Sequence, residues 1–564
     1  MAFNHDAGRN GSVAQIQPNA GNAAPPGWGN LSGQRFPTQT PRRRSPFIIV
    51  SVLLVILIVF TVIRISSIAD GANDQFTLRV ADQQGATVDL RQSMPISPDV
   101  LGVNVFPRMN SASLDGGGGF MNYTPLVMND LQDMHIKLLR FPGGNWGEQH
   151  ILSLNQLGDF SKVLAQANAD GMIQARLSGP ITDANGQTQP DGVTADVNSR
   201  AMFATQWVDY MNNPNSTLRP KTDPYHPVKL WTVGNEPDLL INPLTKKRYT
   251  AAEYADTFIQ FSQAMHQKDP SIKVFGPEIS QFYGVGAGPF DAGHNPWMET
   301  FLQTVGTYEQ QHKDLPFKIL DGVSFHRYQF DNAQLAPSMV LSSTNEWDYT
   351  LPQLRALVRL DLGRDLPVGV TEVNTNPTNP KGDPSRGIAS LWWADTLGSM
   401  MDQQVGYVGF FSASGVNSPY PLFTDDGLHE TSMGRVMQLF SHMQHNLVPM
   451  AVQHDPISVY ATQDDAHQTL SIMLINKSPS AQSVQIAPVD KLLTFSQWPS
   501  VDMSLPGYSM AVLSLHRNGG SEAYSFVEPK QNVTTVGPLA YTVCAKPGDP
   551  PQDVLAPTVH CKGE

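Results

Sequence analysis

A repeating alternation of short apolar runs and helix-length segments extends from residue 101 to residue 446. The runs are mostly apolar and too short for helices, which is typical of parallel strands buried on both faces. Each is followed by a loop and a segment long enough for a helix, and eight such β–α units predict a TIM (β/α)8 barrel. The expected strands are 101–106, 137–141, 172–177, 229–233, 273–275, 322–325, 367–371 and 407–411.

Apolar residues at helical spacing follow several of these strands. The pattern is clearest over 251–268, where Thr250 and Glu253 have the spacing of a capping box. Further helices are expected over 296–308, 351–362, 387–403 and 432–446. The predicted barrel therefore occupies 101–446, with long loops between its elements.

The pattern of the sequence changes after residue 446. Short alternating strands separated by Ser, Asn and Pro turns predict a β-sandwich over 447–517. Residues 66–100 are expected to be a linker with two strands that join this sandwich, because those strands lack partners of their own. The expected strands of the sandwich are 76–80, 87–90, 457–461, 469–476, 483–486 and 509–515.

Residues 518–564 have no clear periodicity and are expected to form a C-terminal tail. The two cysteines of the chain, Cys544 and Cys561, lie in this tail. An oxidising compartment would favour a disulfide between them, and two unpaired thiols are the alternative. Their position leaves the catalytic region without thiol chemistry and without a cysteine metal site.

The segment 47–63 is an unbroken apolar run preceded by arginines at 42–44. As a helix it would span about 26 Å, close to the hydrocarbon core of a membrane. The positive-inside rule places residues 1–46, which have a composition typical of disorder, in the cytoplasm. We therefore expect a transmembrane signal anchor over 47–65, a single-pass protein of the cell membrane and an extracytoplasmic catalytic domain. A cleaved signal peptide is the alternative.

The bulk composition and the missing motifs exclude several function classes. The formal net charge is −13, and an acidic chain offers no basic field for nucleic acid. The sequence contains no HExxH, P-loop or GxSxG motif, so the metalloprotease, NTPase and serine-hydrolase classes have no support. The oligomeric state stays open.

Two of the expected strands end in a glutamate. Glu236 follows the strand at 229–233, and Glu372 follows the strand at 367–371. Because α/β barrels hold their active sites at the carboxyl ends of the strands, the two glutamates are expected to face one pocket. A pair of carboxyl groups is the minimum equipment for hydrolysing a glycosidic bond. Taken alone, each could instead be an ordinary loop or strand-end carboxylate.

With this pair the chain resembles the clan A glycoside hydrolases, which are retaining barrel enzymes, over about residues 75–516. In that clan an Asn-Glu pair ends the fourth strand and supplies the acid/base, and a Glu that ends the seventh strand is the nucleophile. Asn235, Glu236 and Glu372 match these positions. The resemblance implies that Asn235 contacts a sugar hydroxyl next to the reacting carbon.

The run Arg-Phe-Pro-Gly-Gly-Asn from Arg140 to Asn145 resembles the family 51 α-L-arabinofuranosidases. The clan has an arginine at the position of Arg140 that keeps the nucleophile ionised, as a guanidinium beside a carboxylate does. The run Gly-Asn-Glu-Pro-Asp at 234–238 is closer to families 39 and 79, the β-xylosidase and β-glucuronidase groups. Asn145 is included among the expected substrate-binding residues.

Aromatic and histidine side chains complete the expected site. His326 and Tyr328 follow the sixth strand, where the clan places a His or Tyr that contacts the nucleophile or the sugar. Trp146 offers a face for stacking on a sugar, and packing beneath the loop is the alternative. Phe411 ends the eighth strand, where many clan members have a Trp.

These features predict a membrane-anchored, extracytoplasmic retaining glycoside hydrolase that needs no metal or organic cofactor. The resemblance places an arabinofuranoside slightly ahead of a xyloside or a glucuronide as the substrate within a polysaccharide or oligosaccharide. A carbohydrate-binding protein that has lost turnover is the alternative from another class. Glu236 and Glu372 are the expected catalytic residues.

Overall fold

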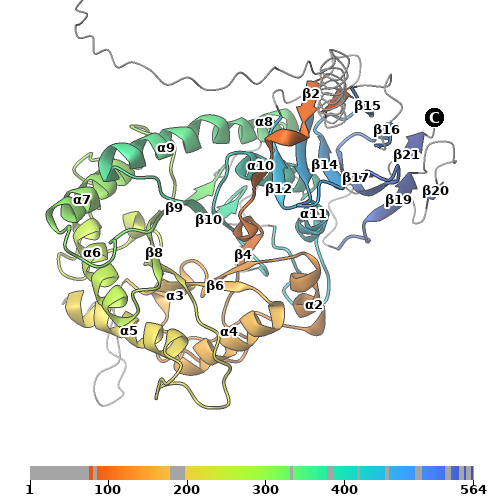
Figure 1. Ribbon diagram of the computed structural model, residues 1–564. Helices are drawn as coiled ribbons and strands as arrows, with labels where there is room; N and C mark the ends of the chain where they lie inside the picture. Colours follow the sequence, from red (N-terminus) through yellow and green to blue (C-terminus); the bar gives the residue numbers. More distant parts are fainter. Residues whose placement is uncertain are drawn as a thin grey trace, which may run out of the picture. The chain divides into compact units, whose positions relative to one another are not determined.

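The computed structural model describes the chain from residue 75 onward (Figure 1). The predicted cytoplasmic segment and the predicted anchor at 47–65 lie outside the described residues. Across the described ranges, no helix is both long and apolar enough to cross a membrane. These ranges are 75–80, 86–177, 197–330, 335–377, 386–415, 420–450, 456–489, 498–527, 535–544, 552–553 and 560–562.

Eight parallel strands close a barrel in which every strand pairs with its neighbours along the chain (Figure 1). The predicted TIM barrel with an additional β domain is thereby confirmed. The strands are β4 (Gly102–Asn104), β5 (Leu138–Phe141), β6 (Asp170–Ala175), β7 (Leu230–Val233), β8 (Lys273–Ile279), β9 (Gly322–Tyr328), β10 (Val368–Asn374) and β11 (Tyr407–Phe410).

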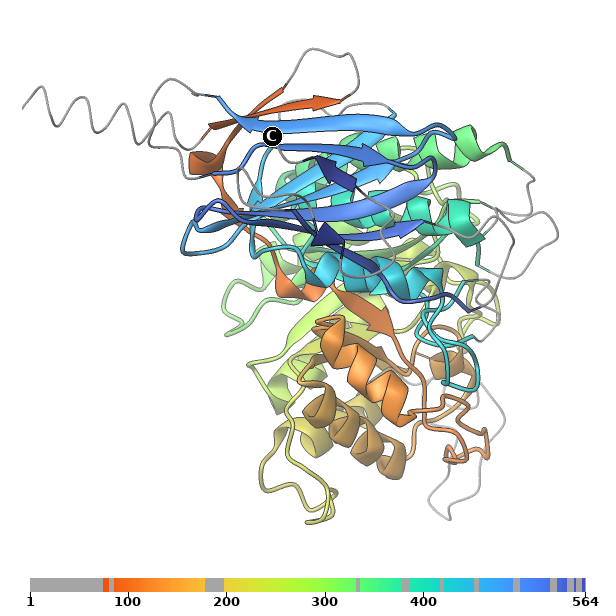
Figure 2. The ribbon, with the colours of Figure 1, turned by 90° about the vertical axis from the view of Figure 1, so that its right-hand side faces the viewer.

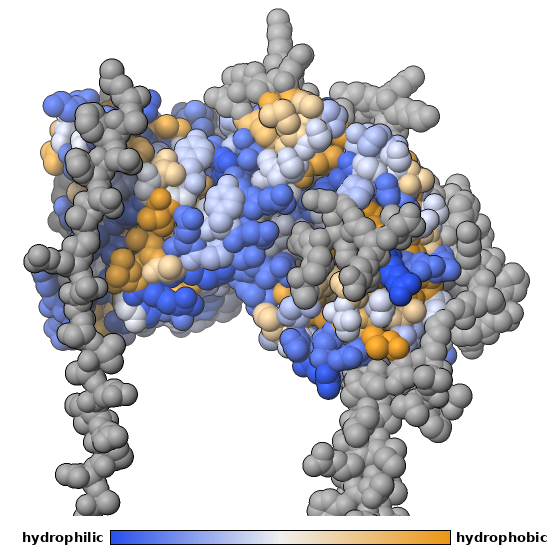
Figure 3. Space-filling model, turned by 90° about the horizontal axis from the view of Figure 1, so that it is seen from above, coloured by the Kyte–Doolittle hydropathy of each residue, from blue (hydrophilic) through white to orange (hydrophobic). Residues whose placement is uncertain are grey.

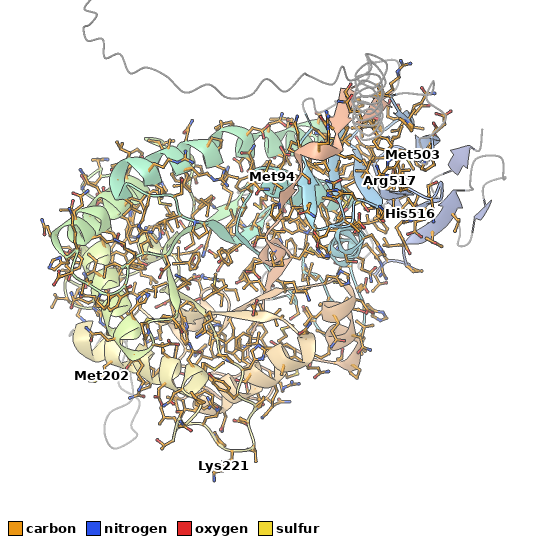
Figure 4. The ribbon with its side chains drawn as sticks, in the orientation of Figure 1. Met94, Met202, Lys221, Met503, His516 and Arg517 are labelled. Carbon is orange, nitrogen blue, oxygen red and sulfur yellow. The ribbon has the colours of Figure 1, made fainter. Side chains whose placement is uncertain are left out.

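Helices surround the barrel, and side chains fill its interior (Figure 4). Helix α6 has the predicted bounds and capping box, with Thr250 and Glu253 bonding each other's backbone. Exposed side chains such as Met202 lie on the outside of the ring of helices. The helices are α2 (Pro125–Asp133), α3 (Trp146–Gln149), α4 (Leu154–Ala167), α5 (Val197–Asn212), α6 (Ala251–Lys268), α7 (Trp297–Gln311), α8 (Pro337–Ser342), α9 (Trp347–Leu362), α10 (Arg386–Asp402) and α11 (Ser432–Ser441).

Strand β8 is longer than the sequence predicted. The predicted strand covered residues 273–275, whereas β8 runs from Lys273 to Ile279. The strand continues through a bulge, and its register against β9 shifts between Pro277 and Ile279. Glu278 lies in this bulge with a φ of 59°, and its side chain is fully buried.

Two antiparallel sheets form the β domain (Figure 2). Their apolar faces share one core, in which Phe76, Ile472, Ile486 and Leu513 are buried. The five-stranded sheet has the order β2-β1-β15-β16-β21 and the eight-stranded sheet β20-β19-β18-β17-β14-β13-β12-β3. The strands are β1 (Gln75–Val80), β2 (Ala86–Asp89), β3 (Met94–Pro95), β12 (Asn446–Val448), β13 (Ile457–Gln463), β14 (Thr469–Asn476), β15 (Gln482–Pro488), β16 (Val501–Leu505), β17 (Ser509–His516), β18 (Ser521–Val527), β19 (Ala540–Cys544), β20 (Gln552–Asp553) and β21 (His560–Lys562).

Part of the segment 518–564, for which the sequence predicted a tail, belongs to these sheets. Strands β18 and β19 pair with each other, and β18 pairs with β17. Alternating Ser and Ala residues give this segment only a weak hydrophobic period, although Ala523 and Phe526 are buried. The side chains of Cys544 and Cys561 lie outside the described residues.

The exposed surface mixes polar and apolar residues. Figure 3 shows one face, on which hydrophobic residues form separate patches between hydrophilic ones. Scattered surface hydrophobics of this kind are normal for folded proteins.

A buried polar cluster joins the barrel helices to the β domain. Asp395 on α10 accepts hydrogen bonds from the Thr344 hydroxyl at 2.6 Å and the Tyr460 hydroxyl at 2.7 Å. The ammonium of Lys477, which follows β14, lies 3.2 Å from the same carboxylate. The Asp395 side chain is buried and that of Lys477 is only 9 % exposed, so the ammonium compensates a carboxylate that water scarcely reaches.

Replacing Lys477 by Met is therefore expected to lower the free energy of unfolding by about 3 kcal/mol, because it leaves the Asp395 charge buried. Lys318→Met is the control: Lys318 lies 3.9 Å from Glu309 but is 56 % exposed, and its loss is expected to cost less than about 1 kcal/mol. Urea unfolding followed by tryptophan fluorescence measures both. If Lys477→Met and Lys318→Met lower the free energy of unfolding equally, the structural role of the cluster is contradicted.

Candidate active site

The carboxyl ends of five barrel strands bring the predicted catalytic glutamates and their partners together. All of these strands run in the same direction, so their last residues meet at one end of the barrel. Burial of both faces selects mostly apolar residues along the strands, and most charged side chains lie near the carboxyl ends. The side chains are Arg140 on β5, Asn235 and Glu236 after β7, Glu278 on β8, His326 and Tyr328 on β9, and Glu372 on β10.

Glu372 is held by donors on both oxygens. The Arg140 guanidinium donates to Oε1 at 2.9 Å, and the Tyr328 hydroxyl donates to Oε2 at 2.7 Å. His326 Nδ1 lies 3.5 Å from Oε2. These contacts fix the orientation of the carboxylate and stabilise its ionised form.

Glu236 faces Glu372 across the site. An oxygen of each glutamate and a ring nitrogen of His326 all lie within 4.8 Å of one another. Glu236 follows the buried strand β7 in a left-handed conformation, with a φ of 47°, and its Oε1 lies 3.2 Å from His326 Nδ1. The side chain of Glu236 is 11 % exposed, so it reaches the pocket.

Arg140 connects most of the site. Besides Glu372, its guanidinium donates to Asn104 Oδ1 at 2.7 Å, Asn235 Oδ1 at 2.9 Å and Glu278 Oε2 at 2.8 Å. The Asn235 amide in turn donates to Asn145 Oδ1 at 3.1 Å. The structure therefore joins the predicted residues Arg140, Asn235 and Asn145 in one hydrogen-bonded chain.

Glu278 is a member of the site that sequence reasoning missed. It is fully buried and touches Arg140, the Thr371 hydroxyl at 2.6 Å and His326 Nε2 at 3.4 Å. The available signal was a glutamate three residues beyond an apolar run, with a Gly-Pro pair between them.

The charges of the site shift its proton affinities in opposite directions. Burial alone would lower the pKa of His326, but Glu372, Glu236 and Glu278 raise it to about 10. Burial alone would raise the pKa of Glu278, but Arg140 and His326 lower it to about 2. Burial raises the pKa of Glu372, opposed by His326 and Arg140. At neutral pH, His326 is therefore an imidazolium beside an ionised Glu278.

A pocket of about 430 Å³ opens onto the two facing glutamates. Trp146 lines it and donates its indole N–H to the Gly118 carbonyl at 3.3 Å, so the predicted stacking residue also packs against a loop. Phe411 occupies the position where many clan members have Trp, and it lines the pocket too. Gly144 has a φ of 55°, and a Cβ there would lie 2.9 Å from the Phe411 ring. The lining residues are Phe106, Gly143, Asn145, Trp146, Gln149, Glu236, Leu239, Ser280, Gln281, Tyr328, Glu372, Pro377 and Phe411.

Glu236, His326 and Glu372 are close enough together to share a metal ion. However, Arg140 and the protonated His326 already place two positive charges against the carboxylates. A cation would have to displace the proton on His326 Nδ1. The donor set therefore favours proton chemistry, and the prediction that no metal is needed stays a prediction.

Tyr328→Phe removes one donor from Glu372 without changing the shape of the pocket. We expect kcat to fall about 10²-fold, the usual cost of a lost donor to a group whose charge changes during the reaction. Steady-state kinetics on a glycoside that the unmodified protein hydrolyses would measure this change in kcat. Tyr283→Phe, on a half-exposed ring outside the lining, is the control and should leave kcat unchanged. A kcat in Tyr328→Phe equal to that of the unmodified protein would contradict a role for this hydrogen bond.

Facing carboxylates on the fourth and seventh strands of a (β/α)8 barrel define a site of the glycoside hydrolase type. A model of glycoside hydrolase family 44 matches residues 159–330, which include Glu236 and His326. The prediction of a glycoside hydrolase is confirmed by this match. No curated protein matches the sequence.

Solved structures share the fold at low identity. The family 51 α-L-arabinofuranosidase of Thermotoga petrophila RKU-1 is 17% identical with a TM-score of 0.55, and the alignment covers 84% of this chain and 96% of that one. A bifunctional glucanase-xylanase from a metagenome library is 15% identical, with a TM-score of 0.53 and coverage of 75% and 97%. A family 44 xyloglucanase of Paenibacillus polymyxa is 14% identical, with a TM-score of 0.50 and coverage of 75% and 97%. These findings support the resemblance to clan A, including family 51.

Proposed function

We propose that this chain is a membrane-anchored, extracytoplasmic retaining glycoside hydrolase that cleaves neutral glycosides, with an α-L-arabinofuranoside as the first candidate. The observation that carries the retaining mechanism is the approach of Glu236 and Glu372 oxygens to within 4.8 Å. Retaining enzymes hold their carboxyl groups about 5–5.5 Å apart, whereas inverting enzymes leave room for a water molecule between them.

In the proposed first step, a Glu372 oxygen bonds to the anomeric carbon while the glycosidic C–O bond breaks. The proton of Glu236 moves to the leaving oxygen, so the alcohol departs neutral. In the second step Glu236 takes a proton from water, and the water oxygen displaces Glu372. Arg140 and Tyr328 stabilise the negative charge that returns to Glu372 when the covalent bond breaks. Asn235 is proposed to contact the reacting sugar through Asn145, which lines the pocket and accepts a hydrogen bond from the Asn235 amide.

A neutral sugar is favoured by the residues around the pocket. The described lining contains no Lys or Arg, and Arg140 lies behind the glutamates with its donors occupied. A glucuronide carboxylate would therefore meet Glu236 and Glu372 without a matching cation. Trp146 and Phe411 offer apolar faces to the C–H groups of a sugar ring. The family 51 arabinofuranosidase among the similar structures supports arabinose before xylose.

The test is hydrolysis of a panel of chromogenic glycosides by the full-length protein in detergent, with Glu372→Ala as the control. Turnover of the arabinofuranoside that is lost in the variant would support the proposal. Turnover of another sugar would replace the substrate and keep the mechanism. A protein that binds glycosides but hydrolyses neither the panel nor long polysaccharides would instead be a carbohydrate-binding protein without turnover.

The membrane anchor and the extracytoplasmic location rest on the sequence of residues 42–63. Fractionation of cells that express the full chain tests them. Protein in the membrane fraction, with the barrel accessible to external protease, would support both. Release of the barrel into the medium would favour the cleaved signal peptide.

The raised pKa of Glu372 predicts the acidic limit of activity. Below this pKa the nucleophile is protonated and inactive, so kcat/KM rises with pH as Glu372 ionises. Because the pKa of Glu372 is raised from 4.5, the midpoint of the acidic limb is expected above pH 4.5. A profile of kcat/KM against pH measures it. A midpoint below the ordinary glutamate value would contradict the role of burial at Glu372.

A further inference from the structure

We propose that Glu278 is a positioning residue for this reaction, which holds Arg140 and His326 against the two catalytic carboxylates. The inference rests on the proposed function, because it concerns how that site keeps its charges balanced. Glu278 does not line the pocket, so it is placed to act through other side chains and not on the substrate itself.

The contacts of Glu278 reach both cations of the site. Its Oε2 accepts a hydrogen bond from Arg140 at 2.8 Å and lies 3.4 Å from His326 Nε2. Its Oε1 accepts from the Thr371 hydroxyl at 2.6 Å. A carboxylate at Nε2 holds a proton on that nitrogen, and the proton on Nδ1 then faces Glu236 and Glu372.

The backbone of Glu278 also supports the acid/base residue. Its carbonyl oxygen accepts a hydrogen bond from the Glu236 N–H at 2.9 Å. Glu278 has a φ of 59°, in the left-handed region that a residue with a side chain rarely adopts. Such a conformation in a fully buried bulge, at the end of a barrel strand, is common at functional sites.

Charge balance gives Glu278 a specific role. The reaction starts with Glu236 protonated and Glu372 ionised, so Glu372 and Glu278 together match the two cations, Arg140 and His326. Without the charge of Glu278 the buried site would carry one excess positive charge. His326 would then lose its proton at a lower pH than in the unmodified protein, because fewer negative charges stabilise its charged form.

Groups from each neighbouring element contribute to the charge balance around Glu278. They are Arg140 from β5, Glu236 after β7, Tyr254 from α6, His326 and Tyr328 from β9, and Thr371 and Glu372 from β10. Only Arg140 and His326 among them are cations. Every other group is neutral or acidic, so the loss of the Glu278 charge has no compensation within the described site.

The experiment compares Glu278→Gln with the unmodified protein, both full-length in detergent, on the glycoside that the panel identifies. We expect kcat to fall about 10- to 100-fold, the scale seen when a partner that orients a functional side chain is lost, with KM changed less than about threefold. We also expect the basic limb of the pH profile to move down by about one unit or more. If both limbs of the pH profile stay where they are in the unmodified protein, the proposal is overturned, whether kcat is unchanged or lower.

Two variants separate this role from a structural one. Glu278→Asp keeps the charge, so it is expected to lower kcat and to leave the basic limb of the pH profile near its original position. A basic limb in Glu278→Asp that moves down by about one unit or more would overturn the proposal. This test holds even if Glu278→Gln fails to fold. Glu309→Gln is the matched control, because Glu309 on α7 is a buried carboxylate that pairs with Arg364 and does not line the pocket. It should leave both limbs unchanged.

NMR of 13C-labelled histidine provides a readout that needs no turnover, with His326 assigned by His326→Gln. His326 is expected to stay protonated beyond pH 8 in the unmodified protein and to titrate at lower pH in Glu278→Gln. If His326 loses its proton at the same pH in both proteins, the proposal is overturned. If His326 loses its proton at a lower pH in Glu278→Gln but the protein hydrolyses no glycoside, the result would support the role of Glu278 and contradict the proposed function.

Discussion

Glu372→Ala is expected to lower kcat by about 10⁴-fold or more on every glycoside that the protein hydrolyses. The structure gives the reason: no other described carboxylate that lines the pocket lies beside Arg140 and Tyr328. Water in its place is a weaker nucleophile and cannot form the covalent intermediate. Stopped assays over hours, with an activated aryl glycoside, measure the residual rate.

Azide distinguishes a lost nucleophile from a damaged fold. In Glu372→Ala the anion can enter the space of the carboxylate next to Arg140 and attack the anomeric carbon, which gives a glycosyl azide of inverted configuration. Glu309→Ala, which removes a buried carboxylate outside the site, is the control and should keep kcat within about twofold. Activity in Glu372→Ala close to that of the unmodified protein would refute the assignment of the nucleophile.

Glu236→Ala is expected to lower kcat by about 10²–10⁴-fold on glycosides with poor leaving groups, because the leaving oxygen receives no proton. The loss should be much smaller in the first step with a dinitrophenyl leaving group, which departs as a stable anion. Pre-steady-state kinetics would then show a burst, since the covalent intermediate forms but water is no longer activated.

Here azide should restore the second step and give a glycosyl azide of retained configuration, because it attacks the covalent intermediate. The opposite stereochemistry in the two variants is a sharp test of both roles. His326 Nδ1 contacts both glutamates, at 3.2 Å from Glu236 and 3.5 Å from Glu372, whereas Arg140 and Tyr328 donate to Glu372. Equal losses on all leaving groups in Glu236→Ala would argue against the acid/base role.

The catalytic pair could be predicted from the sequence because its signals are local. An apolar run buried on both faces and ending in a polar residue marks the end of a parallel strand, and the TIM barrel places such ends in one site. Glu236 and Glu372 each have such a run directly before them, and the resemblance to clan A then assigned their roles. Arg140 was found for the same reason, since it lies within the strand at 138–141.

Other features depend on contacts between distant parts of the chain. Glu278 meets Arg140 and His326 across sequence separations of 138 and 48 residues, and its own strand was predicted to end at Phe275. The protonated state of His326 depends on three carboxylates from three strands. The pairing of β18 with the β domain likewise has little local signal, because small Ser and Ala residues alternate on one face of that strand.

The sequence by itself determined the barrel, the positions of its strand ends and the two catalytic glutamates, because burial of a parallel strand imposes a composition that a reader of the chain can see. The tertiary structure alone decided the third carboxylate and the charge balance of the site. Ionisation in a buried cluster follows from distances of a few ångströms between side chains, and the linear order of residues does not contain those distances.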